Sequence, residues 1–284
     1  MIESLLRHDY NNRLSKKFNV LSEKNEHALI CYVLPGYPDI NTTHKIVSAV
    51  VQAGADIIEL GIPFSDPVAD GKVIQEASYH SLNNGITPEK CLTTAKEIRV
   101  KFPDLPIVVI TYYNILYKRG LREFLKQSVE YGIDGFIIPD MSLEECDEYV
   151  REASSLGLAT IFLASPNTKE SRLKSIASKS SGFVYIVSVY GTTGMRESFE
   201  SYTMDNIKNV KRILGSTIPL AVGFGINTPA QAKLMIDSGA DAIIVASALI
   251  NKIKNSKVDE GKMVEEIKSF VSDMKKACEK YQTN

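Results

Sequence analysis

The sequence has no tryptophan, four cysteines and four histidines among 284 residues. The cysteines are scattered and form no C-x-x-C pair, so zinc knuckles and thioredoxin-like chemistry are disfavoured and free thiols are expected. The histidines His8, His27, His44 and His80 do not follow the apolar runs that we interpret as strands. This distribution argues against a zinc centre and against a Ser-His-Asp triad.

The chain also has no excess of either charge, with 33 Lys and Arg against 34 Asp and Glu. A surface for nucleic acid or anionic membranes is therefore not indicated. The first residues, MIESLLRHDYNNRLSKKF, lack the apolar core of a secretion signal, and no later apolar run is long enough to cross a bilayer. We expect a cytoplasmic protein.

Short apolar runs rich in β-branched residues alternate with helix-length amphipathic stretches, which is typical of parallel βαβ units. The eight runs lie at residues 29–33, 56–60, 107–112, 135–139, 159–163, 183–187, 220–224 and 242–246. Eight such units predict a closed (β/α)₈ TIM barrel rather than an open doubly wound sheet. A barrel of this length is routinely one domain, so residues 1–284 are expected to form a single domain.

Further helices are expected at residues 3–21, where a helix could close the bottom of the barrel, and at residues 262–281. A short helix should open within ASAL, residues 246–249, after the eighth strand. A Gly followed two residues later by Asp precedes a strand in GADIIEL, GIDGFII and GADAIIV, which indicates a repeated turn with Gly ending the helix. The long segment 188–203 follows the sixth strand, on the face where barrel active sites lie.

Two acids lie in and just after the second predicted strand. Glu59 interrupts an apolar run, and burial there would favour its protonated form and a role as proton donor. The alternative is a structural acid bonded to a neighbouring loop. Asp70 lies in PVADG, where an ordinary turn or helix-start aspartate is the alternative. Together on one face, the two acids could supply a proton donor and a fixed negative charge.

The last third of the chain places glycines in adjacent loops of the same face. Gly191 and Gly194 follow the sixth strand, and Gly223 and Gly225 lie at the end of the seventh. With the short helix after the eighth strand, these positions predict a phosphate site of backbone N–H groups. No predicted strand contains a lysine, and Lys72 is expected in a loop, as is Lys118, so Schiff-base chemistry is disfavoured.

The stretch ELGIPFSDPVADGKVIQEA resembles the signature of the tryptophan synthase alpha chain family. CYVLPGYPD, TYYN, IIPD, SVYGTTGMR and GFGIN are similar to further segments of that family, so the resemblance runs from about residue 13 to the C-terminus. It implies cleavage of indole-3-glycerol phosphate to indole and D-glyceraldehyde 3-phosphate. Glu59 would protonate the indole C3, and Asp70 would accept a hydrogen bond from the ring N–H.

The resemblance also implies which residues bind the substrate and which partner the chain has. The indole pocket would be lined by Tyr32, Tyr112, Ile137 and Phe224, with Tyr185 as a further active-site tyrosine; the phosphate would be held by Gly194, Gly225 and Ser247, and Thr193 would help to close a loop over Asp70. No cofactor is expected on this chain, because pyridoxal phosphate would belong to a beta chain in an alpha-beta-beta-alpha heterotetramer. We expect residues 63–67 and the segment 188–203 to contact that partner, because they lie on the face where indole must leave.

Ala246 stands where the family usually has Gly, Thr192 replaces a usual Val, and Tyr190 is bulky for its loop. These departures concern phosphate binding and loop closure rather than the two acids. A stand-alone indole-3-glycerol phosphate lyase, a different phosphate-binding barrel similar to thiamin phosphate synthase, and a catalytically weak activating subunit are the alternatives. The pair of acids favours an enzyme over an inert subunit.

Overall fold

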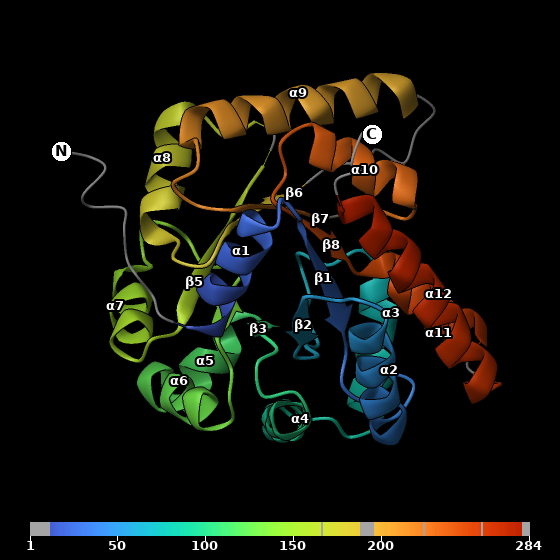
Figure 1. Cartoon of the computed structure of the whole chain (residues 1–284). Helices are drawn as coiled ribbons and strands as arrows, with labels where there is room; N and C mark the ends of the chain where they lie inside the picture. The colour runs from blue at the N-terminus through green and yellow to red at the C-terminus, as the bar shows by residue number, and fades with distance from the viewer. Residues whose placement is uncertain (1–11, 166, 188–195, 224, 257, 280–284) are drawn as a thin grey trace.

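The computed structural model describes residues 12–165, 167–187, 196–223, 225–256 and 258–279. Eight parallel strands pair in chain order and close into a barrel, with β8 beside β1 (Figure 1). The strands are β1 (Ala28–Val33), β2 (Ile57–Gly61), β3 (Ile107–Ile110), β4 (Gly135–Ile137), β5 (Ala159–Ala164), β6 (Val184–Val187), β7 (Leu220–Gly223) and β8 (Ala242–Val245). The predicted (β/α)₈ barrel is confirmed.

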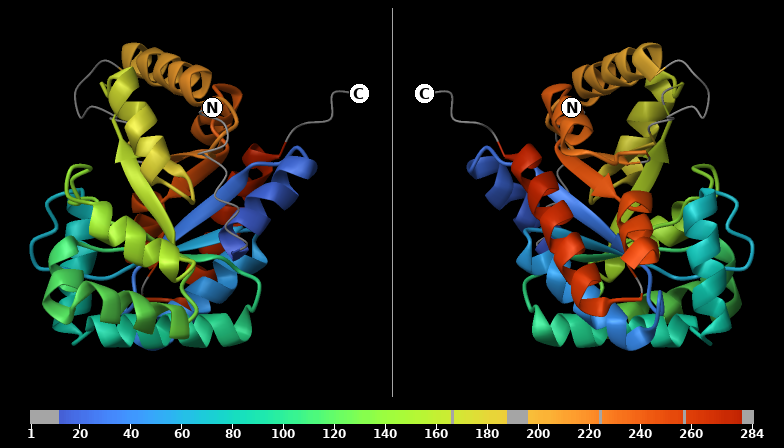
Figure 2. Two further views of the ribbon diagram at one scale, coloured as in Figure 1. Left: turned by 90° about the vertical axis from the view of Figure 1, so that its left-hand side faces the viewer. Right: turned by 90° about the vertical axis from the view of Figure 1, so that its right-hand side faces the viewer.

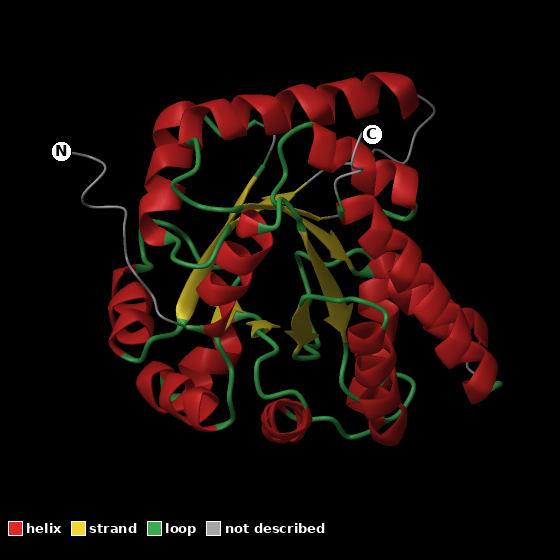
Figure 3. Cartoon of the chain, in the orientation of Figure 1, coloured by secondary structure: helices red, strands yellow, loops and turns green. Residues whose placement is uncertain are grey.

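Helix α1 (Arg13–Glu23) lies at one end of the barrel, and the other helices surround the strands on the outside, as the two side views and the colouring by secondary structure show (Figures 2 and 3). The outer helices are α2 (Ile40–Gln52), α3 (Lys72–Asn83), α4 (Pro88–Lys101), α5 (Tyr113–Arg119), α6 (Leu121–Glu130), α7 (Asp147–Ser155), α8 (Glu170–Lys179), α9 (Arg196–Leu214), α10 (Pro229–Asp237), α11 (Ser247–Ser256) and α12 (Glu260–Cys278). The strands are almost continuously apolar because the barrel interior covers one face and these helices cover the other.

The structure shifts several predicted boundaries. Asp56 lies in the turn before β2, and β3 ends at Ile110, two residues earlier than expected, because Tyr112 is already the N-cap of α5. The prediction that Lys72 and Lys118 fall in loops is wrong, since they lie in α3 and α5. The conclusion drawn from them is unaffected, because none of the eight strands carries a lysine.

Helix α1 closes the N-terminal end of the barrel, as predicted, and lies in front of the strands in Figure 1. Its apolar face, Leu14, Phe18 and Leu21, packs in the same cluster as the inward-facing residues of the strands. Phe18 meets Phe183 edge to face, with ring centroids 6.0 Å apart. The helix begins at Arg13, and the earlier part of the predicted segment lies outside the described residues.

The three Gly-x-Asp turns form one repeated structure at this end of the barrel. Each Asp carboxylate accepts the backbone N–H of the residue that begins, or lies near the beginning of, the preceding strand. The donors are Leu29 N to Asp56 at 2.9 Å, Ile107 N to Asp134 at 2.8 Å, and Leu220 N to Asp241 at 2.9 Å. Each turn therefore fastens two neighbouring strands through a side chain.

A basic side chain from an outer helix neutralises each of these carboxylates. The pairs are Lys275 with Asp56 at 2.9 Å, Arg99 with Asp134 at 2.7 Å, and Lys211 with Asp241 at 2.7 Å. The glycines of the turns have positive φ, and a Cβ on Gly132 would lie 2.7 Å from the Arg99 side chain. Glycine is thus required both for the backbone conformation and for the passage of the basic side chain.

Candidate active site

Glu59 occupies the upper layer of the barrel interior, toward the C-terminal ends of the strands. Below it, alternate residues of the strands fill the barrel with an apolar cluster that includes Ile30, Ile57 and Ile137. Tyr32 pairs with Glu59 in the register of β1 and β2 and therefore points to the same side. Ile137, expected in the indole pocket, is fully buried within this inner cluster.

Two tyrosines lie across the ends of strands at this level. A Cβ on Gly61 would lie 2.3 Å from the Tyr32 hydroxyl, and a Cβ on Gly223 would lie 2.4 Å from the Tyr185 hydroxyl. Each tyrosine therefore needs a glycine at the end of a strand in order to lie where it does. The sequence offered a signal for Gly61, which stands two residues after Glu59 and thus on the same side of β2.

One oxygen of the buried Glu59 carboxyl, Oε2, has no hydrogen-bond partner among the described residues. The residue is only 1% exposed. Burial, and to a smaller extent the charge of Asp70, raises the pKa of Glu59 from 4.5 to about 8. Glu59 therefore carries a proton at neutral pH, as its position in a strand predicted.

Asp70 lies in the loop between β2 and α3, where its backbone N–H donates to the carbonyl of Pro67 at 3.0 Å. Burial raises the pKa of Asp70 from 3.8 to about 6, while a hydrogen bond from Tyr112 acts in the opposite direction. At neutral pH Asp70 is mostly ionised while Glu59 is mostly protonated. The mouth of the barrel thus combines a neutral carboxylic acid with a carboxylate.

Tyr112 connects this loop to the end of β3. Its hydroxyl accepts the backbone N–H of Ala69 at 3.1 Å, and its ring stacks on Phe64 with centroids 5.1 Å apart. The same hydroxyl lies close enough to the Asp70 carboxylate to oppose the rise in its pKa. Sequence reasoning placed Tyr112 in the indole pocket and did not foresee these contacts, which join residues more than forty positions apart.

The residues expected at the phosphate come from adjacent strands. Gly225 follows β7 with φ +76°, and Ser247 is the first residue of α11, directly after β8 and its neighbour Ala246. Because β7 and β8 are paired, the Gly225 turn and the N-terminus of α11 lie at the same end of the barrel. Thr193, Gly194 and Phe224 lie outside the described residues, as do Tyr190, Gly191 and Thr192.

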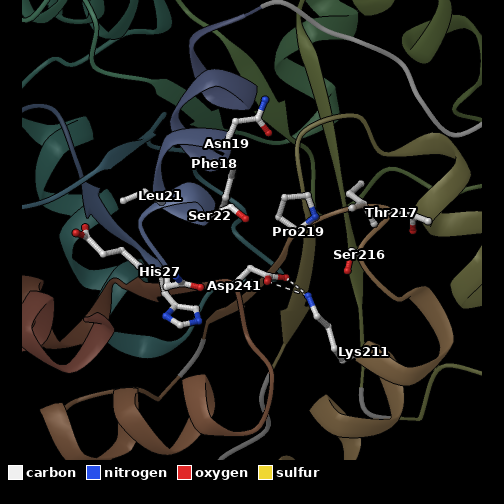
Figure 4. A pocket seen from close by; sticks show the side chains of 13 residues that line it. Phe18, Asn19, Leu21, Ser22, His27, Lys211, Ser216, Thr217, Pro219 and Asp241 are labelled. Carbon is white, nitrogen blue, oxygen red and sulfur yellow. Dashed lines mark hydrogen bonds and ion pairs between the residues drawn. The ribbon is translucent and has the colours of Figure 1, made fainter. Parts of the chain in front are cut away.

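A separate cavity of ≈ 340 Å³ lies at the opposite end, beside α1 (Figure 4). It is lined partly by Phe18 of α1, by Pro219 just before β7, and by the ion pair of Lys211 with Asp241. Pro219 precedes β7 and Asp241 precedes β8, so the cavity lies at the N-terminal end of the barrel. It is not part of the site that contains Glu59.

Among the described residues, no three His, Cys, Asp or Glu side chains come together as a metal-binding group. No helix within the same residues is long and apolar enough to span a membrane.

The chain is similar throughout to proteins of one family. The family model described as "Tryptophan synthase alpha chain" matches residues 18–279. The tryptophan synthase alpha chain of Thermoanaerobacter sp. (strain X514) is 45% identical over 264 residues, which cover 93% of this chain and 98% of that protein. That of Methanosarcina barkeri (strain Fusaro / DSM 804) is 44% identical over 254 residues, covering 89% of this chain and 92% of the other.

Solved structures of tryptophan synthase are similar to this chain as well. The tryptophan synthase alpha chain from Legionella pneumophila subsp. pneumophila superposes with a TM-score of 0.87 at 30% identity, covering 96% of this chain and 99% of that one. A chain of the aminoacrylate-bound tryptophan synthase from M. tuberculosis gives a TM-score of 0.82 at 28% identity, covering 94% and 99%. This chain therefore belongs to the tryptophan synthase alpha chain family, and thereby to the enzymes of tryptophan synthesis.

Proposed function

We propose that the chain cleaves indole-3-glycerol phosphate to indole and D-glyceraldehyde 3-phosphate and passes the indole to a beta chain for tryptophan synthesis. The observation that supports this reaction best is the pair of acids in the barrel mouth. Glu59 is buried and protonated at neutral pH, whereas Asp70 is mostly ionised. A retro-aldol cleavage of this substrate needs both a proton donor and an anion that stabilises developing positive charge.

The electrons can be followed through the substrate itself. Glu59 gives its proton to the indole C3, and the ring becomes an indolenium cation whose N–H donates to the Asp70 carboxylate. The bond between C3 and the glycerol chain then breaks, and its electron pair returns to the ring and neutralises the nitrogen. The adjacent glycerol hydroxyl loses its proton, for which the Glu59 carboxylate is now an available base, and becomes the aldehyde of the product.

The substrate's ring nitrogen serves as the electron sink, which is the part that a lysine imine plays in other aldolases. We assign the ring to the apolar and aromatic residues Tyr32, Tyr112, Ile137, Tyr185 and Phe224. Gly194, Gly225 and Ser247 would bind the phosphate through backbone N–H groups, helped by the N-terminus of α11. Thr193 would close its loop over Asp70 and exclude water from the site.

The proposed partner is a beta chain that carries pyridoxal phosphate, in an alpha-beta-beta-alpha assembly, and this chain would need no cofactor of its own. Two exposed apolar side chains support a contact surface beside the site. Val68 in the β2–α3 loop is 81% exposed and Tyr117 on α5 is 71% exposed. The hydrogen bond between Ala69 and Tyr112 joins the two elements that carry them. The expected contacts of residues 63–67 and 188–203, and the cytoplasmic location, remain predictions.

The test is indole formation by the purified chain from indole-3-glycerol phosphate, compared with Glu59→Gln and Asp70→Asn, with and without a beta chain loaded with pyridoxal phosphate. We expect turnover that rises when the beta chain is added and falls by two orders of magnitude or more, roughly, in either variant. Full turnover without any response to the beta chain would instead identify a stand-alone lyase. Stimulation of the beta chain by all three proteins, without cleavage, would identify an activating subunit.

A further inference from the structure

Tyr112 stands at the junction between β3 and the loop that carries Asp70. The residue is the N-cap of α5, so its backbone is fixed by the end of the strand and the start of the helix. The next backbone N–H, that of Tyr113, donates to the Asp140 carboxylate at 2.9 Å, which ties the junction to the end of β4. The Tyr112 side chain therefore projects from a rigid part of the barrel.

From this base Tyr112 contacts the Asp70 loop through both its ring and its hydroxyl. The ring stacks on Phe64 at a centroid distance of 5.1 Å and an interplanar angle of 26°. The hydroxyl accepts the Ala69 N–H at 3.1 Å and lies near the Asp70 carboxylate, whose pKa it lowers. Because a hydroxyl can accept and donate at the same time, one side chain can hold both the loop backbone and the carboxylate.

We propose that Tyr112 is a positioning residue, whose hydroxyl holds the loop and aims the Asp70 carboxylate into the barrel mouth, in addition to any contact of its ring with substrate. A residue that only lined the indole pocket would not need its hydroxyl bonded to the loop backbone. The proposed arrangement explains how a loop aspartate reaches a fixed position opposite a strand glutamate.

The other titratable groups near Asp70 do not take the place of the Tyr112 hydroxyl. Glu59 from β2 is buried and repels the Asp70 charge once ionised, so it favours the neutral form. Tyr32 from β1 and Tyr185 from β6 lie close enough for the Asp70 charge to raise the pKa of each hydroxyl, but they add no positive charge. Asp140 faces Tyr112 and is also negative. Burial raises the pKa of Asp70, and the Tyr112 hydrogen bond opposes that rise.

The test is Tyr112→Phe, which keeps the ring and its stacking on Phe64 but removes the hydroxyl. Tyr79→Phe is the matched control, because Tyr79 is exposed on the next helix, α3. The kinetic measurement is kcat and kcat/KM for indole-3-glycerol phosphate cleavage across pH. We expect the acid limb of the Tyr112→Phe profile to move upward by roughly one pH unit, with about a tenfold loss at pH 5.5. We expect no change in Tyr79→Phe.

Because the kinetic measurement rests on the function proposed above, two measurements without substrate accompany it. One is the carboxyl ¹³C titration of Asp70, assigned with Asp70→Asn, which should shift upward in Tyr112→Phe. The other is hydrogen exchange of the Ala69 amide, which should become faster in the same variant. An unshifted Asp70 titration together with unchanged Ala69 exchange would overturn the role of Tyr112. Absence of cleavage by the wild type, with both substrate-free changes present, would overturn the reaction and support the role of Tyr112.

Discussion

Replacing Glu59 by Gln should make the protein less active and, at alkaline pH, more stable. Gln has nearly the shape of Glu but cannot ionise, so the substitution removes the charge without opening a cavity. The wild-type carboxyl is 1% exposed, and its Oε2 has no hydrogen-bond partner among the described residues. Ionisation in that environment is costly, and the cost belongs to the folded state alone.

The direction of the pH effect on stability follows from the pKa of Glu59 in the unfolded and in the folded protein. The Glu59 pKa is raised from 4.5 to about 8 on folding. Between these values the folded protein keeps a proton that the unfolded chain has lost, so the stability of the wild type falls as pH rises through this window. The free energy of unfolding is lowered by about 5 kcal/mol in total. This loss is complete above pH 8 and absent below pH 4.5. Glu59→Gln lacks this loss.

The assay is urea unfolding of both proteins at pH 5, 7 and 9. The midpoint of the variant should rise relative to the wild type by about 1–2 M urea between pH 5 and pH 9. A constant offset from burying the amide cancels in this comparison, and Asp70 ionises in both proteins. Glu130→Gln, at an exposed position on α6, should show no such change. A midpoint difference that stays constant with pH would refute the account of Glu59 as an uncompensated buried acid.

Three further predictions follow from the same geometry. The dependence of kcat/KM for cleavage on pH should be bell-shaped, rising as Asp70 ionises near pH 6 and falling as Glu59 loses its proton near pH 8. A kcat/KM that does not change between pH 5 and pH 9 would contradict these roles. Gly61→Ala should lower kcat roughly tenfold or more in steady-state kinetics, because the new Cβ displaces the Tyr32 ring. Gly261→Ala on α12 is the control and should leave kcat unchanged. Asp134→Ala should lower the free energy of unfolding by about 3–5 kcal/mol in urea titrations, because Arg99 loses its ion-pair partner. The kcat should stay unchanged, and a loss of kcat without a loss of stability would contradict this structural role.

The parts of the fold that could be predicted from the sequence are those governed by local periodicity. Apolar runs that alternate with amphipathic stretches gave the barrel, and the position of Glu59 inside such a run gave its raised pKa. The predicted turns also form, because the Gly conformation and the Asp hydrogen bond both depend on a few adjacent residues. The role of their basic partners could not be predicted, since Lys275 reaches Asp56 from the other end of the chain.

The site was predicted less completely because its loops depend on tertiary contacts. The end of β3 was placed at Tyr112, but the strand stops at Ile110, and an Asp140 carboxylate bonds the Tyr113 amide at the start of α5. Only the folded barrel brings Asp140 to that position. The bond from Ala69 to Tyr112 is likewise invisible in the sequence, where TYYN indicates an aromatic pocket as readily as a loop anchor.

The buried carboxyls at the two ends of the barrel have opposite surroundings, one with several hydrogen-bonding and charged partners and one with few. Asp134, 3% exposed, is bonded to the Ile107 amide, to Arg99 at 2.7 Å and to Arg13 at 3.0 Å. Burial still raises its pKa, but all three partners oppose the rise, so its charge fastens strands together. Glu59 is equally buried, but its Oε2 has no hydrogen-bond partner among the described residues. A partner that satisfied Glu59 would also stabilise its anion and weaken it as a proton donor, so the instability at the mouth is a requirement of the proposed reaction.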